Sequence, residues 1–173
     1  MEEKTSAPSD QEAALMVRAK AIHASALTLD AHADIEIPGK PSSYVGSDGL
    51  SKVAPQKMRT GGLDAVVMAI AVGPMPRNAE GYAAAKAIAQ TKLEAVKALA
   101  DDKTNNSTIT LNSDELITAH NEGKSALVLG FQNALILGTE LDGINTLFNS
   151  GVRVFALTHM GHNDFADSSR TLF

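Results

Sequence analysis

Four apolar runs, separated by segments with helical patterning, constrain the fold of this 173-residue chain more than any other feature. The run over residues 63–72, LDAVVMAIAV, is almost continuously apolar and contains β-branched residues. Such runs are typical of strands that are buried on both faces of a parallel sheet. We expect strands over residues 26–34, 63–72, 125–132 and 152–159, the first of them also buried.

The segments between these runs space their apolar residues as helices do. The clearest helix covers residues 80–100, and an apolar stripe predicts another over residues 11–26. Asn112 and Glu115 resemble a capping box, which predicts a helix that ends near Gly123. The remaining segments are predicted as short helices over 57–62 and 141–149, loops over 37–55 and 101–107, and a disordered N-terminus over 1–10.

The alternation of strands and helices predicts an α/β fold made of parallel βα units. The first, third and fourth runs end in polar residues, whereas the second continues through Val72-Gly73-Pro74. In barrel and doubly wound folds, active sites lie at the C-terminal ends of the strands. We therefore expect a functional site at that edge of the sheet.

The end of the first run carries the sequence His32-Ala33-Asp34. Alternate residues of a strand point to the same face, so the imidazole and the carboxylate can reach one cation. Borderline cations such as zinc accept both kinds of ligand. Because the motif is short, a polar strand end with a capping aspartate stays open as an alternative.

Gln132 and His159 end the third and fourth runs. Gln132 stands where a metal site would place a carboxylate, and the alternative is an amide that holds the neighbouring loop. His159 could bind a substrate carboxylate, polarise a carbonyl or ligate a metal, and a structural hydrogen bond to a backbone carbonyl is the alternative. The other histidines, expected to be structural or exposed, are His23, His120 and His162.

The composition argues against several other functions. The net charge is −5 and no run of Lys or Arg stands out, so no nucleic-acid or anionic-membrane partner is predicted. The absence of cysteine excludes disulfides, thiolate zinc sites and a cysteine nucleophile. No P-loop, dinucleotide fingerprint or Gly-x-Ser-x-Gly motif is present.

The sequence as given predicts a cytoplasmic protein without a membrane segment. No apolar stretch approaches the ~20 residues that span a bilayer. The polar, acidic start lacks the basic and apolar regions of a signal peptide. If such a peptide has been removed, a periplasmic or exported location is expected instead.

Three segments together point to a known family. They are LDAHAD over residues 29–34, KMRTGGLDA over residues 57–65, and GVRVFALTH over residues 151–159, which is followed by Asn163 and Ala166-Asp167-Ser168. In that order they resemble the opening metal motif, the helix-to-second-strand segment and the fourth-strand signature of the renal (membrane) dipeptidase family of zinc metallopeptidases.

The resemblance implies a (β/α)8 barrel of the TIM type. Residues 11–173 would form its N-terminal half, with about the first four βα units and a truncated C-terminus. The family hydrolyses dipeptides with a metal-bound hydroxide and one or two zinc ions, and its members are often dimers, so a homodimer is expected at full length. An open four-stranded sheet should expose unpaired edges.

The resemblance also implies roles for individual residues. His32 and Asp34 would bind the first metal, His159 would be catalytic and contact the substrate, and Asn163 would contact the substrate. Gln132 stands at the position of the family's bridging glutamate. An amide is a neutral and weaker ligand, so a second metal is in doubt, and a single metal or an altered substrate class becomes an alternative.

Two other functions are compatible with the same residues. One is a related barrel amidohydrolase that acts on another amide or ester. The other is a non-catalytic half-barrel binding protein, which Gln132 and the early end of the chain favour. Because the family's remaining metal ligands come from later strands, the isolated chain is expected to be inactive.

Overall fold

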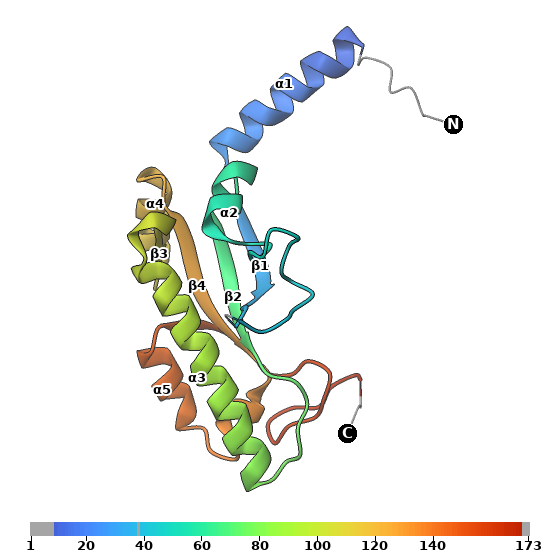
Figure 1. Ribbon diagram of the computed structural model, residues 1–173, viewed down its shortest axis with the longest axis vertical. Helices are drawn as coiled ribbons and strands as arrows, with labels where there is room; N and C mark the ends of the chain where they lie inside the picture. The colour runs from blue at the N-terminus through green and yellow to red at the C-terminus, as the bar shows by residue number, and fades with distance from the viewer. Residues whose placement is uncertain (1–8, 38, 171–173) are drawn as a thin grey trace, which may run out of the picture.

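One parallel β-sheet organises the fold, as seen in a computed structural model that describes residues 9–37 and 39–170 (Figure 1). Strands β2 (Ala65–Ala71) and β4 (Ser125–Gln132) pair at its centre, and β1 (Leu29–Asp34) lies beside β2. The other edge of β4 is shared by β3 (Ser107–Ile109) and β5 (Val152–Ala156), which pair with its first and second halves. All of these pairings are parallel.

Helices connect the strands, because two parallel neighbours cannot be joined by a tight turn. The short helix α2 (Pro55–Gly61) precedes β2 and ends at Gly62, whose φ of 71° is a left-handed conformation that glycine adopts without strain. The long helix α3 (Ala79–Asp101) follows β2 and runs across the sheet (Figure 1). The other elements are α1 (Asp10–Ser25), η1 (Lys103–Asn105), α4 (Ser113–Asn121), η2 (Ala134–Leu137) and α5 (Gly143–Asn149).

The hydrophobic core lies between the central strands and α3. Every residue of β2 except Ala71 is buried, which explains why its sequence is almost continuously apolar. One face of α3 packs against the same cluster. Its buried side chains recur at helical spacing and are Ala85, Ala89, Leu93 and Val96.

The structure confirms the predicted α/β fold and the four predicted strands, and it adds a fifth. Strand β3 begins at Ser107, which was predicted to be the end of a loop. Three residues are too few to show a strand period, and β3 is defined by its pairing with Ser125–Leu127 of β4. The prediction of four strands was therefore wrong by one short strand.

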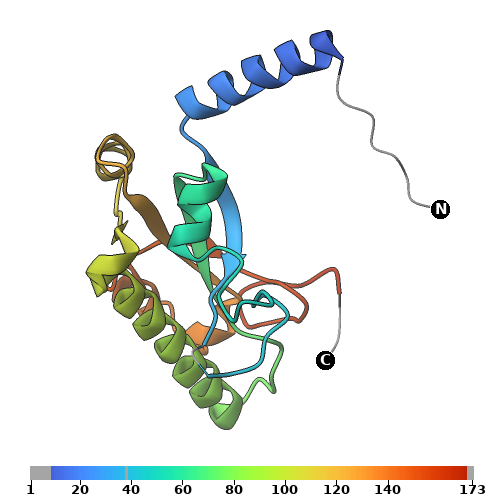
Figure 2. The same cartoon turned by 45° about the horizontal axis from the view of Figure 1, so that its top comes forward.

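Two predicted elements, β1 and α1, are present but are less buried than the sequence predicts. Strand β1 was expected to be buried, yet it pairs only with β2, and Leu29 is 49 % exposed. Helix α1 begins with a capping box between Ser9 and Glu12, although residues 9 and 10 were expected to be disordered, and none of its residues is buried. It points away from the sheet in both views (Figure 2).

No helix in the described part of the chain is both long enough and apolar enough to cross a membrane.

A buried pair of amides joins the C-terminal ends of three strands. Asn133, directly after β4, donates from Nδ2 to the carbonyl oxygen of Val72 at 3.2 Å, beyond the end of β2. Asn163 donates from Nδ2 to Asn133 Oδ1 at 3.2 Å and to the carbonyl oxygen of Leu157, beyond the end of β5, at 2.6 Å. Both asparagines are buried. Since buried polar groups need partners, this pair holds the three strand ends in register.

We predict that Asn163→Ala lowers the free energy of unfolding by at least about 2 kcal/mol, because it leaves buried polar partners without hydrogen bonds. The lost bonds include those that Asn163 Oδ1 accepts from the backbone N–H groups of Phe165 and Ala166. Urea unfolding measures the change, with Asn145→Ala on the exposed face of α5 as the matched control. Equal stability of the two variants would contradict a scaffolding role for Asn163.

Candidate functional site

A cavity of about 570 Å³ lies at the C-terminal ends of the strands. It is lined by His32 and Asp34 of β1, Gln132 of β4, and His159 beyond β5. The structure thus places in one cavity the four polar residues that the sequence marked at strand ends. We call it the strand-end cavity.

A bulge in β1 sets the position of the His32 side chain. Asp30 pairs with Val66 and Ala33 with Met68, so that two residues of β1 oppose one residue of β2. The backbone N–H of His32 donates to Asp30 Oδ1 at 3.0 Å, which stabilises this local turn of the strand. Bulges of this kind redirect side chains and often lie beside functional sites.

Asp30, His32 and Asp34 line the strand-end cavity together. His32 is exposed, and Asp34 is partly buried. The phenol of Tyr44, from the long segment before α2, interacts with the carboxylate of Asp34, and this interaction raises the pKa of Tyr44 above its usual value. Asp34 therefore lies where a loop and a strand end meet.

Gln132 lies at the end of β4, opposite Ala71 of β2 and Ala156 of β5. Its backbone carbonyl accepts from the N–H of Val72 at 3.3 Å. The chain then turns at Asn133, which has a φ of 80°, a conformation that asparagine tolerates better than most residues. The partly buried Gln132 side chain is thus held at the cavity by strands on both sides.

His159 lies three residues beyond β5, and hydrogen bonds fix the backbone on either side of it. Asn163 binds the carbonyl oxygen of Leu157, and Ser168 Oγ donates to the carbonyl oxygen of His159 itself at 2.6 Å. Ser168 is 8 % exposed. Residues 160–170 therefore fold back beneath His159 and leave its side chain exposed at the cavity.

Asn163, predicted to contact the substrate, does not line the strand-end cavity. Its side chain is 3 % exposed, and both of its polar atoms are already hydrogen-bonded. A direct contact with a ligand would require it to give up those bonds. In the structure, Asn163 holds the backbone of Leu157 and so helps to position His159. The contact of Asn163 with the substrate stays a prediction.

The donors at this cavity fit part of a metal site. His32 and Asp34 offer an imidazole and a carboxylate, which suit a divalent cation such as zinc. Gln132 offers a neutral amide oxygen, which is a weaker ligand. Within residues 9–37 and 39–170, no group of three or more His, Cys, Asp or Glu side chains is placed to hold a metal ion. These residues therefore provide only part of a coordination shell.

Lys92 of α3 also lines the strand-end cavity, which no sequence pattern predicts. It is one of several lysines on that helix, and helical spacing alone does not distinguish it from its neighbours. Partial burial lowers the pKa of Lys92, while the carboxylates of Asp34 and Glu36 act in the opposite direction. The cavity therefore contains an ammonium group as well as carboxylates.

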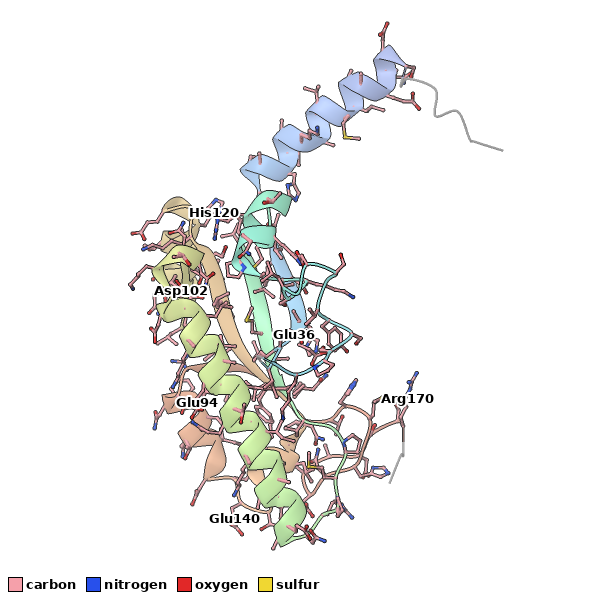
Figure 3. All side chains as sticks on the ribbon, viewed as in Figure 1. Glu36, Glu94, Asp102, His120, Glu140 and Arg170 are labelled. Carbon is pink, nitrogen blue, oxygen red and sulfur yellow. The ribbon has the colours of Figure 1, made fainter. Side chains whose placement is uncertain are left out.

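A second cavity of about 610 Å³ lies on the other side of Asp34, between residues 35–56 and α3. It is mainly lined by apolar side chains but also by Glu36, whose Oε1 is buried and has no hydrogen-bond partner among the described residues. Figure 3 shows Glu36 beside the end of β1. Asp34 faces both cavities, whereas Lys92 lines only the strand-end cavity.

His120 lies at the opposite end of the sheet from Glu36 (Figure 3). Its Nδ1 is 3.0 Å from Asp64 Oδ1. Thr28 also donates to Asp64, from its backbone N–H and its hydroxyl, at 2.8 Å each. This cluster connects α4 to the starts of β1 and β2, so the structure confirms a structural place for His120.

Comparison with solved structures shows similar proteins. The probable dipeptidase PvdM from Pseudomonas aeruginosa has a TM-score of 0.81 and 25% sequence identity, over 92% of this chain and 41% of that one. A metallopeptidase described as dipeptidase AC of family M19 has a TM-score of 0.58 and 18% identity, over 78% and 45%. A metallopeptidase from Rhodobacter sphaeroides, solved with a phosphinate mimic of the dipeptide L-Ala-D-Ala, has a TM-score of 0.52 and 17% identity, over 74% and 41%.

At their low identities, the last two similarities support the fold alone. The chain spans about two fifths of the length of these solved structures, so its sheet corresponds to part of a TIM barrel. No curated protein matches the sequence. The sequence does match the family profile described as membrane dipeptidase (peptidase family M19) over residues 16–172. The chain therefore belongs to the membrane dipeptidase family of metallopeptidases.

Proposed function

We propose that the protein to which this chain contributes hydrolyses dipeptides with a metal ion held in part by His32 and Asp34. The observation that carries this proposal is the convergence of His32, Asp34, Gln132 and His159 on one cavity at the C-terminal ends of parallel strands. That edge is where enzymes with barrel folds place their catalytic groups. Membership of a metallopeptidase family supports the same reaction class.

In this proposal each residue has a separate task. His32 and Asp34 hold the metal, and the bulge in β1 fixes the direction of the imidazole. His159 donates a hydrogen bond to the substrate carbonyl, or to the oxyanion that forms from it. A zinc ion bound here would supply a water molecule that is deprotonated near neutral pH and can attack a peptide carbonyl.

The 173 residues alone are proposed to be inactive. No three His, Cys, Asp or Glu side chains in their described part are placed to hold one metal ion, whereas catalytic zinc sites use three protein ligands. The chain covers only 41% and 45% of two of the solved structures that it matches. The tests below therefore use the complete protein.

A non-catalytic binding protein is the second candidate, and the neutral side chain of Gln132 favours it. An amide neither compensates the charge of a divalent ion nor bridges two such ions as a carboxylate does. Zinc content separates the two candidates, because a binding scaffold does not require stoichiometric metal.

We predict that His32→Ala in the complete protein abolishes dipeptide hydrolysis and weakens zinc binding. The loss of affinity should exceed the roughly 10- to 100-fold that follows removal of a residue supporting a ligand. Metal analysis after dialysis measures it, with His23→Ala on the exposed helix α1 as the matched control. Stoichiometric zinc in the His32 variant would remove this residue from the site.

We also predict that Gln132→Glu increases the affinity for a second divalent ion, because a carboxylate can bridge two cations. Isothermal titration with zinc should then show a higher stoichiometry or a tighter second binding step. Gln56→Glu, the same change on an exposed residue of α2, is the control. Identical titrations for the wild type and the Gln132 variant would show that Gln132 does not face a metal position.

A further inference from the structure

The second cavity, between residues 35–56 and α3, has no part in the proposed reaction. His32, Gln132 and His159 line the strand-end cavity and not this one. Its volume of about 610 Å³ lies within the range of pockets that enclose small molecules. Pockets of this kind combine an apolar lining with a few polar groups that orient the ligand. The walls of the second cavity have the same composition.

One wall of the second cavity is an ordered turn in the long segment before α2. Val45 and Ser51 form an antiparallel bridge at the base of this turn. Lys57 of α2 braces it, because its ammonium lies 2.9 Å from the carboxylate of Asp48 and also donates to the carbonyl oxygen of Leu50 at 3.3 Å. The turn is therefore held by its own contacts and does not need to collapse onto α3.

The opposite wall of the second cavity is apolar. Met68 of β2 and Val96 of α3 both line it and are buried. Two alanines, Ala54 before α2 and Ala95 of α3, line it as well, and their short side chains leave the space open. An apolar ligand would gain free energy by leaving water for such a surface.

Glu36 supplies the polar group of this cavity. Its Oε1 is buried and accepts no hydrogen bond from the described residues. Lys40 also lines the cavity, but it is exposed, so its ammonium can stay in water. Lys92 lines the strand-end cavity and acts on Glu36 only at longer range. A buried carboxylate oxygen without a donor is unfavourable, and a ligand that donates to it would remove this cost.

The charge of the Glu36 carboxylate indicates which donor fits. A neutral hydroxyl group would supply a hydrogen bond and leave the negative charge without compensation. An ammonium group would supply both the hydrogen bond and the opposite charge, and charge-assisted hydrogen bonds are the stronger kind. The ligand that suits the second cavity is therefore apolar over most of its length and cationic at one end.

We propose that the second cavity binds a small molecule with an apolar body and a protonated primary amine, whose ammonium donates to Glu36 Oε1. This site is separate from the metal site, and the inference does not depend on the proposed function. Asp34, Ser51 and Val53 line both cavities, so the bound molecule would lie against a wall of the strand-end cavity.

The test measures the binding of three probes to the complete protein by calorimetry. The probes are 4-phenylbutylamine, 4-phenylbutan-1-ol and 4-phenylbutanoate, which share one apolar body and are cationic, neutral and anionic at neutral pH. The cation is expected to bind with a Kd of about 1 mM or lower, as an efficient ligand of this size can. The alcohol is expected to bind about tenfold more weakly or worse, because it lacks the charge. The carboxylate should not bind.

Two variants locate the site, each with a matched control on the exposed side of α3. Glu36→Gln removes the charge and keeps the shape, and Glu94→Gln is the same change on an exposed residue. Ala95→Phe fills the cavity, and Ala98→Phe adds the same ring on the exposed side. The melting temperature of every variant is measured. Glu36→Gln should keep the wild-type value, since Glu36 Oε1 has no hydrogen bond to lose.

Glu36→Gln should weaken binding of 4-phenylbutylamine about tenfold or more and remove its advantage over the alcohol. Ala95→Phe should abolish binding of both probes, and the two control variants should bind as the wild type does. If Ala95→Phe does not fold, the comparison of Glu36→Gln with Glu94→Gln decides alone.

Three results would overturn the inference. The first is that 4-phenylbutylamine does not bind to the wild type, as when another segment of the complete protein fills the cavity. The second is equal affinity for the amine and the alcohol, which would show that Glu36 does not anchor the ligand. The third is equal binding of the amine to the wild type and Glu36→Gln, which would place it elsewhere, such as on a metal ion. Absence of zinc or of dipeptide hydrolysis would refute the proposed function and leave this inference intact.

Discussion

The parallel pairing of β2 with β4 is the interaction on which the rest of the structure depends. Seven consecutive residue pairs, from Ala65 opposite Ala126 to Ala71 opposite Gln132, hold these strands in one register. Because the two strands are in register, their C-terminal ends reach the same edge of the sheet. Strand β1 continues that alignment on one side, and β5 does so on the other. The ends of β1, β4 and β5, three separate segments of the sequence, thereby bring polar side chains to one cavity.

The polar residues at this edge fall into two groups, one exposed and one buried. His32 and His159 are exposed and available to a ligand, whereas Asn133, Asn163 and Ser168 are buried and bind backbone atoms. The buried amides hold the strand ends, and the strand ends hold the exposed imidazoles. A binding site needs such support, since a side chain that binds a metal or a substrate must stay in one geometry.

Much of this could be predicted from the sequence, and the physical reason is burial. Strand β4 was predicted with its observed bounds, residues 125–132, because a strand covered on both faces must be continuously apolar. Polar residues at the ends of such strands stand out, so the convergence of His32 and Gln132 was expected. Active sites of barrel folds lie at the C-terminal edge of the strands, and this rule located the predicted site at that edge.

Other features depend on contacts that a single sequence does not display. The bulge in β1 exists only in the pairing with β2, and the exposure of β1 follows from its place at the sheet edge. The burial of Asn163 depends on Asn133, thirty residues earlier in the chain. Lys92 has neither a motif nor a special spacing, and its place at the cavity arises from the tertiary fold that brings α3 there.

His32 and Asp34 are proposed to hold a metal ion at this edge of the sheet. Diffraction from zinc-soaked crystals of the complete protein, recorded at the zinc absorption edge, tests it most directly. If these two residues hold the metal, an anomalous peak is expected about 2.0–2.2 Å from a ring nitrogen of His32 and from a carboxylate oxygen of Asp34. A fully occupied zinc site elsewhere, with neither residue bound to it, would show that His32 and Asp34 do not hold the metal.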